Sequence, residues 1–348
     1  MVAYASTATV TDTTGFPIET MRSLAVILLV SYHVIGPGEN QGLDIQSPHF
    51  LRLYADFFID VRMPFFAFIA GYLYALRPPS LAGFPEFLIG KARRLVVPGA
   101  VAVIAFAIVA NIMGTRFAAP ISQVWYLLSH SYAHFWFLQA VLVLFVFFGL
   151  LDVLLQRRGA VLLIVLSAGV YLSGFRFETS LFSVNGTLYL LPYFVLGVAF
   201  FRHAKDISEQ TDKLTLVLLV IAIACAFWNM RVLHDTGTFS VVRHDLQSLG
   251  FGMSLCILAM LWFPQVPLLE KISPYAFTIY LYHIFGTVSA RMACNAFEIS
   301  HLDIRFAFGL VGGLMIPVIM HETVQRIPWI SAIVLGNRVR AKGDLGAP

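Results

Sequence analysis

Charge is what this sequence has little of: Asp, Glu, Lys and Arg make up 12% of its 348 residues, against about 25% in soluble globular domains. Cysteine is also scarce. The three cysteines all lie within apolar runs, so neither a disulfide framework nor a spaced zinc site is indicated. Hydrophobic residues account for 59% of the chain, and the segments between apolar runs are too short to bury a core of their own. These scarcities exclude an ordinary soluble protein and indicate one integral membrane domain.

Ten apolar runs approach the ~20 residues that a helix needs to span a bilayer. They lie at about 18–36, 56–76, 95–113, 133–151, 159–175, 186–202, 214–231, 246–263, 273–294 and 305–321. We therefore expect an all-α, polytopic membrane protein with about ten transmembrane helices. The expected division is a disordered cytoplasmic tail at 1–17, a transmembrane domain at 18–325 and a cytoplasmic C-terminal tail at 326–348.

The short loops predict an orientation, because Lys and Arg are retained on the cytoplasmic side. With the N-terminus inside, fourteen basic residues fall in cytoplasmic segments: Arg77, Lys91, Arg93, Arg94, Arg157, Arg158, Arg202, Lys205, Lys213, Lys271, Arg326, Arg338, Arg340 and Lys342. Six fall outside: Arg52, Arg116, Arg176, Arg231, Arg243 and Arg305. This bias predicts that both termini are cytoplasmic. It also explains the pI of about 9.0 without a nucleic-acid partner.

The first expected helix contains two ionisable residues, Arg22 and His33. Charge within hydrocarbon is costly and is usually kept for function. Their separation of eleven residues, at about 100° per residue, places both side chains on one face, about 16 Å apart along the axis. Arg22 would lie near the cytoplasmic interface and His33 near the outer end. In the alternative, Arg22 extends to the lipid headgroups and His33 only contacts another helix.

Several motifs occur in a characteristic order. They are the Arg22-to-His33 spacing, MPFFAFIAGY at 63–72, KARR at 91–94 leading to Pro98, HFWFL at 134–138, and SPY at 273–275 followed by IYLYH at 279–283. This order resembles the acyltransferase-3 family, bacterial ten-helix membrane enzymes that O-acylate surface carbohydrates. The resemblance implies a bacterial inner-membrane enzyme that transfers an acyl group from cytoplasmic acyl-CoA to a hydroxyl of a cell-surface or exported carbohydrate or glycolipid. Acetyl-CoA is the expected donor, and succinyl transfer is the alternative.

Four basic residues share the expected cytoplasmic depth and suit the phosphates of acyl-CoA: Arg22, Lys91, Arg93 and Arg94. The last three could instead be ordinary anchors of the positive-inside kind. The family's paired-arginine element is represented here by Lys91 and Arg94, with Arg93 between them. Lys keeps the charge but lacks the bidentate fork of Arg, so the phosphate contact would differ.

The expected chemistry centres on His33, because a neutral imidazole can remove the proton of a sugar hydroxyl near pH 7. His33 would act as general base or would carry the acyl group itself. Asp60 lies at a matching depth and could hold the second ring nitrogen of His33, although it could equally pair with Arg62. Arg62 could also bind a succinyl carboxylate.

Three further residues complete the expected substrate site. His134 and Trp136 begin the fourth expected helix at the depth of His33, where Trp136 could stack on a sugar or serve as an interfacial anchor. His283 lies in mid-span and could be a helix contact only. No histidine pair at helical spacing has a carboxylate partner, so no metal is expected. Two other classes stay open, a transporter or flippase for a glycan or glycolipid and a non-catalytic partner in an export complex.

Overall fold

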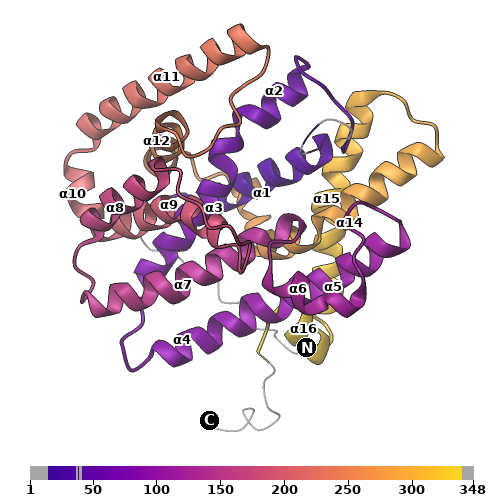
Figure 1. Cartoon of the computed structure of the whole chain (residues 1–348), viewed down its shortest axis with the longest axis horizontal. Helices are drawn as coiled ribbons and strands as arrows, with labels where there is room; N and C mark the ends of the chain where they lie inside the picture. Colours follow the sequence, from indigo (N-terminus) through magenta and orange to yellow (C-terminus); the bar gives the residue numbers. More distant parts are fainter. Residues whose placement is uncertain (1–14, 37, 39–40, 339–348) are drawn as a thin grey trace.

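The chain folds as a bundle of helices. The structure is a computed structural model that describes residues 15–36, 38 and 41–338. In chain order the helices are α1 (Ile18–Ile35), α2 (Phe50–Phe57), α3 (Ile59–Leu76), α4 (Phe84–Lys91), the π-helical η1 (Ala92–Val96), α5 (Val97–Ile112), η2 (Ile121–Gln123), α6 (Val124–Ser129), η3 (Ala133–Phe135), α7 (Trp136–Leu154), α8 (Ala160–Leu172), α9 (Val184–Arg202), α10 (Ala204–Glu209), α11 (Thr211–Thr236), α12 (Leu246–Trp262), α13 (Pro267–Glu270), η4 (Ser273–Tyr275), α14 (Ala276–Ala296), α15 (Leu302–Val324) and α16 (Pro328–Val334). Within the described residues no strand is present, and the all-α prediction is confirmed (Figure 1).

Six helices of the described chain are long and apolar enough to cross a membrane, and one bent pair could add a seventh. The six are Ile18–Ile35, Phe84–Ile112, Ala133–Leu154, Val184–Arg202, Thr211–Thr236 and Leu302–Val324. The polytopic membrane class is confirmed, whereas the count of about ten is not.

Four of the expected spans account for the difference in count. The expected span 56–76 corresponds to α3, whose first turn carries Asp60 and Arg62. The expected span 159–175 corresponds to α8, which has 13 residues, short of the ~20 that a span needs. The expected spans 246–263 and 273–294 correspond to α12 and α14. The chain bends by 108° between Leu246–Trp262 and Pro267–Ala296, at a break over 263–266, so the two segments make at most one span.

The expected tails are described only in part. Residues 1–14 lie outside the described residues, so the prediction of a tail at 1–17 is almost wholly untested. The expected C-terminal tail, 326–348, begins with α16, which packs against α5 and α15. A short apolar helix therefore continues the bundle beyond the last expected span.

The two central helices α3 and α9 approach each other at glycines. A Cβ on Gly71 of α3 would lie 1.9 Å from the carbonyl oxygen of Phe194, and a Cβ on Gly197 of α9 would lie 2.0 Å from that of Phe68. Both distances are far below van der Waals contact, so any larger residue would force the helices apart. Small residues allow this close approach of backbones in membrane proteins, where dispersion contacts replace the hydrophobic effect between helices.

One end of the bundle is fastened by a buried ion pair. The two Nη atoms of Arg202 each lie 2.7 Å from an oxygen of Asp152, and the hydroxyl of Tyr74 donates to Asp152 at 2.9 Å. A bidentate guanidinium–carboxylate pair is among the strongest polar contacts in proteins. This contact joins α3, α7 and α9, and we call this side of the bundle the Arg202 end. Arg202 also donates to the carbonyl of Arg157 at 3.2 Å, which connects the end of α9 to the loop after α7.

The opposite side, which we call the Arg116 end, holds the loops that follow α1, α5 and α14. Arg116 donates to the side chain of Gln41 at 2.8 Å, and Arg291 donates to the carbonyl of Gly42 at 3.3 Å. In Figure 1, α10, which directly follows α9, lies at the left edge and the turn between α14 and α15 lies at the right edge. The loops after α1, α5 and α14 therefore lie at one end, and the ends of α3, α7 and α9 lie at the other. Which end faces the cytoplasm stays a prediction.

We predict that Gly197→Ala destabilises the protein, because the new methyl group meets backbone that cannot move aside. The expected loss is about 1–3 kcal/mol, the usual range for overpacking a core. Thermal unfolding in detergent, followed by size-exclusion fluorescence, measures it. Gly169→Ala on α8 is the matched control, since a Cβ there meets nothing within 4 Å. Equal melting temperatures for the two variants would contradict the close α3–α9 contact.

The alternation of loops predicts a labelling pattern for single cysteines. Ala82→Cys and Arg158→Cys, both at exposed positions of the Arg202 end, should react with a membrane-impermeant maleimide only after cell lysis, whereas Thr238→Cys should react on intact cells. The unsubstituted chain supplies the background, since Cys256 and Cys294 are buried. Labelling of Ala82→Cys and Thr238→Cys from the same side would refute the arrangement.

Candidate active site

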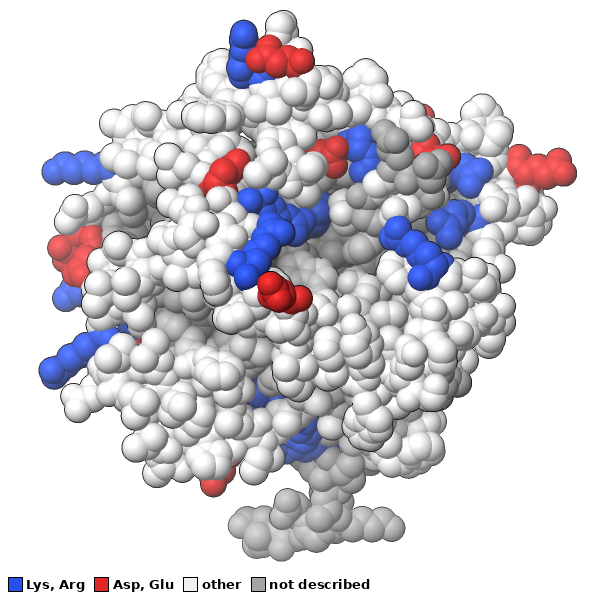
Figure 2. Space-filling model, in the orientation of Figure 1, with Lys and Arg blue, Asp and Glu red and all other residues white. Residues whose placement is uncertain are grey.

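A cavity of about 1170 Å³ opens among α1, α3, α5, α14 and the loops at the Arg116 end. Its lining includes His33, His134 and four arginines, namely Arg62, Arg116, Arg243 and Arg291. Binding sites for small molecules usually measure about 300–1,000 Å³, so the cavity lies just above the upper end of this size class. Figure 2 shows Lys and Arg side chains gathered around the hollowed middle of one face of the molecule.

Three histidines from three helical segments meet beside this cavity. The ring of His33 on α1 lies 4.9 Å from that of His283 on α14 and 6.0 Å from that of His134 in η3, and the rings of His134 and His283 are 5.0 Å apart, all between centroids. His283 is fully buried and His134 is 7% exposed. Within the described chain, no group of three or more His, Cys, Asp or Glu residues could hold a metal ion.

The hydrogen bonds of the cluster leave His33 as its free member. A carbonyl can only accept, so Nδ1 of His283 donates to the carbonyls of Ile279 and Tyr280, at 3.0 and 2.9 Å. In the same way Nε2 of His134 donates to the carbonyl of Leu281 at 3.4 Å. The second nitrogen of each ring therefore carries a lone pair when the ring is neutral. Among the described residues His33 itself makes no hydrogen bond, so either of its nitrogens can exchange a proton with a ligand.

Asp60 does not hold His33 in this structure. Both carboxylate oxygens of Asp60 are buried without a hydrogen-bond partner among the described residues, and Asp60 is not part of the cavity lining. The expected alternative, a pair with Arg62, is also not formed. Arg62 donates to the carbonyl of Ala55 at 3.3 Å, and its guanidinium lies 3.4 Å above the ring of Tyr32. The immediate neighbours of His33 are imidazoles instead of a carboxylate.

Trp136 and Arg62, both expected as substrate contacts, line the cavity. Trp136 packs on Gly186 of α9, where an added Cβ would lie 2.7 Å from the indole. This contact holds the indole in place beside the histidine cluster. The structure thus brings His33, Arg62, His134 and Trp136 to one cavity, with His283 directly behind them.

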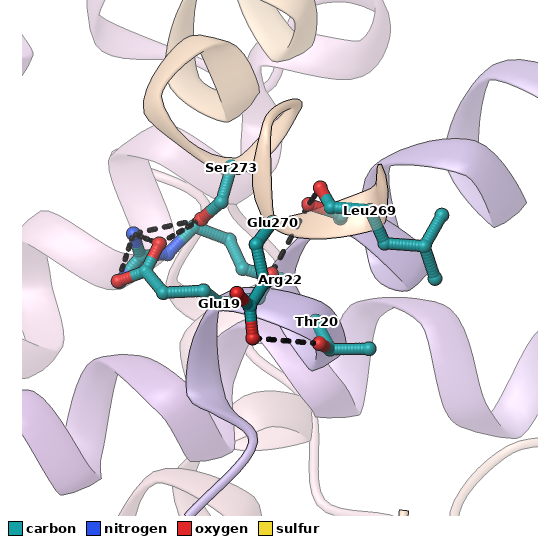
Figure 3. Close-up of polar contacts among 7 residues, drawn as sticks. Glu19, Thr20, Arg22, Leu269, Glu270 and Ser273 are labelled. Carbon is teal, nitrogen blue, oxygen red and sulfur yellow. Dashed lines mark hydrogen bonds and ion pairs between the residues drawn. The ribbon is translucent and has the colours of Figure 1, made fainter. Parts of the chain in front are cut away.

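Arg22 lies at the other end of α1 and does not line the cavity. Its Nη1 forms an ion pair with Glu19 at 3.1 Å and donates to Ser273 at 3.1 Å (Figure 3). The hydroxyl of Ser23 donates to the carbonyl of Leu269 at 2.6 Å, which further fastens α1 to the segment before α14. Arg22 is thus engaged with protein groups, and donor binding by Arg22 stays a prediction.

The other three expected donor residues also lie away from the cavity. The ammonium of Lys91 lies 3.5 Å from the centroid of the Phe145 ring, and Arg93 donates to the carbonyl of Gly336 at 2.9 Å. Arg94 is adjacent in η1. The three therefore share one short segment, while Arg22 is held by its own ion pair, and their role in donor binding stays a prediction.

Three cavity arginines were not among the residues predicted from the sequence. Arg116, Arg243 and Arg291 come from a loop after α5, a loop before α12 and the end of α14. One signal was available for Arg116 and Arg243, because both stand on the side that the charge bias marks as poor in basic residues, whereas Arg291 falls within the expected span 273–294. Exceptions to the positive-inside pattern deserve a separate explanation.

Comparison with protein families matches residues 18–322 to the acyltransferase-3 family, described as an acyltransferase domain. No curated protein and no solved structure matches the chain. The family match covers nearly the whole chain and includes every residue of the histidine cluster.

The hydrogen-bond pattern predicts unequal reactivity of the histidines towards diethyl pyrocarbonate, which modifies an accessible unprotonated imidazole nitrogen. His33 should be modified at least about tenfold faster than His283, whose free nitrogen is buried. Peptide mass spectrometry over time measures both rates, and the exposed His301 gives the upper limit for a solvent-accessible ring. Equal rates for His33 and His283 would show that the cavity does not distinguish them.

Proposed function

The chain belongs to the acyltransferase-3 family, and on this premise we propose that it is a membrane O-acyltransferase. The proposed reaction moves an acyl group, acetyl in the first place, from cytoplasmic acyl-CoA to a hydroxyl of a cell-surface or exported carbohydrate. The proposed location is the bacterial inner membrane, with both termini cytoplasmic. The observation that carries the proposal is His33, the one imidazole of the cluster with no hydrogen bond among the described residues, on the wall of a large cavity.

The proposed chemistry needs a base at the position of His33. As the sugar oxygen attacks the thioester carbon, its proton passes to the free nitrogen of His33, and the carbon–sulfur bond breaks. The proton then passes to the CoA thiolate, which leaves as the thiol. We propose direct transfer without an acyl-histidine intermediate, with thioester and sugar bound together; the cavity volume of about 1170 Å³ supports this choice.

The neighbouring histidines support this role. When His33 takes up the proton it becomes a cation within the membrane domain, where an isolated charge is costly. The free nitrogen of His283 is buried without a partner among the described residues, and its ring lies 4.9 Å from that of His33. A lone pair at this place can accept a hydrogen bond from protonated His33. His283 is therefore a positioning residue in the proposed mechanism.

The proposed donor site lies at the Arg202 end, where Arg22, Lys91, Arg93 and Arg94 provide positive charge for the CoA phosphates. The axial distance of about 16 Å between Arg22 and His33 along α1 suits a ligand whose charged end and reactive thioester are joined by a long arm. The acyl group would then reach the cavity between the helices.

We expect His33→Ala to lower single-turnover release of CoA thiol from acetyl-CoA by about 10²–10⁴-fold, the usual contribution of a general base. Extracted surface carbohydrate serves as acceptor, and a thiol-reactive dye reports the product. The control is His301→Ala, which changes an exposed histidine beyond the cavity and should keep wild-type turnover. Retained turnover in a folded His33→Ala protein would exclude His33 as the base.

A further inference from the structure

Four arginines from four different elements surround the cavity. Arg62 comes from α3, Arg116 from the loop after α5, Arg243 from the loop before α12 and Arg291 from the end of α14. The only carboxylate among the described lining residues belongs to Asp44. The wall of the cavity is therefore strongly positive, and a low-dielectric cleft lined by one sign of charge concentrates ligands of the opposite sign.

None of the four guanidinium groups forms an ion pair with a carboxylate among the described residues. Arg116 contacts the side-chain amide of Gln41, and Arg291 contacts the carbonyl of Gly42. The guanidinium of Arg243 lies 5.0 Å from the ring centroid of Tyr189. Arg62 is 3% exposed and still lacks a charged partner within ion-pair distance.

Some arginines outside the cavity are paired with carboxylates. Arg202 is bound by Asp152 at 2.7 Å, Arg52 by Asp56 at 3.6 Å and Arg231 by Asp235 at 3.0 Å. A guanidinium has five donors and stays charged at any physiological pH. Several unpaired guanidinium groups around one cavity therefore leave charge and donors that a ligand can satisfy.

The position of the arginines favours the acceptor as this ligand. They lie at the Arg116 end, whereas Arg22 and Lys91 lie away from the cavity, and Arg22 is at the opposite end of α1 from His33. If the donor enters from the Arg202 end, its phosphates stay at that end and its thioester extends to His33. The arginines would then face whatever approaches His33 from the other side.

We propose that the acceptor of this enzyme is an acidic carbohydrate, whose carboxylate or phosphate binds to Arg116, Arg243 and Arg291 with Arg62 deeper in the wall. This inference rests on the proposed acyl-transfer function and specifies its substrate class. A carboxylate is a planar oxyanion and a phosphate a tetrahedral one, and each can accept a pair of hydrogen bonds from a guanidinium group. The charged group fixes the sugar so that a neighbouring hydroxyl meets His33.

The experiment uses the full chain in lipid nanodiscs and isothermal titration with matched probes. Digalacturonic acid is compared with its methyl ester, and glucose 6-phosphate with glucose. At least one anionic probe should bind with an affinity at least about tenfold higher than that of its neutral partner. One charge-assisted hydrogen bond contributes about this much binding free energy. Arg116→Gln and Arg291→Gln should each remove about tenfold of this affinity without changing the affinity for the neutral partner.

The control variant is Arg231→Gln, which removes an exposed arginine of α11 outside the cavity. It should bind all probes as the wild type does. Equal binding of anionic and neutral probes, or no binding of either anion, overturns the proposal. A loss of affinity for acetyl-CoA in Arg116→Gln and Arg291→Gln also overturns the proposal, because it would assign the arginines to the donor phosphates. A loss of affinity for succinyl-CoA alone overturns it as well, because it would assign them to the carboxylate of the acyl group.

The same preparations separate this inference from the proposed function. His33-dependent release of CoA thiol tests acyl transfer, and anion binding tests the arginines. Thiol release without anion preference overturns the acidic acceptor only. Anion preference without His33-dependent thiol release supports the arginine site and counts against acyl transfer.

Discussion

A charge placed in hydrocarbon must find a partner or water, and this constraint organises the polar groups of the protein. Asp152 is 1% exposed and is bound by both Arg202 and Tyr74, so three helices are joined where a carboxylate would otherwise be isolated. Arg22 obeys the same constraint through Glu19. The arginines around the cavity instead have room for water or a ligand. Ion pairs thus fasten helices to one another, whereas Asp60 and the cavity arginines form no ion pair among the described residues.

Glycine contacts position the elements that carry the histidines. Gly286 of α14 lies against α15, where its Cβ would be 2.2 Å from the carbonyl oxygen of Gly312. Gly309 and Gly313 of α15 face Val34 and Val30 of α1, with Cβ distances of 2.7 and 2.5 Å. Helix α15 therefore holds α1 and α14 together through close contacts of small residues. His33 and His283 stand on these two helices, so their proximity follows from this packing.

The site is asymmetric along the axis of the bundle, which agrees with a reaction between substrates from opposite sides of a membrane. Basic residues outside the cavity gather near η1, and a second basic group surrounds the cavity at the Arg116 end. The three histidines, one each from α1, η3 and α14, meet beside that cavity. In the proposed mechanism the acceptor reaches His33 from the Arg116 end and the donor from the Arg202 end.

The sequence by itself determined the helical membrane class, because composition and run length are local properties, and the order of its motifs indicated the family that the comparison then matched. The role of His33 stays a prediction. The sequence could not determine the number of spans, since the short α8 and the bend between α12 and α14 depend on packing. It placed Asp60 beside His33 by depth alone, whereas rotation of α3 about its axis decides which residue faces α1. Only the tertiary structure brought His134 and His283 to His33, and Arg116, Arg243 and Arg291 to one cavity. These residues are far apart in sequence, and their meeting depends on how separate helices pack, which no periodicity within one helix encodes.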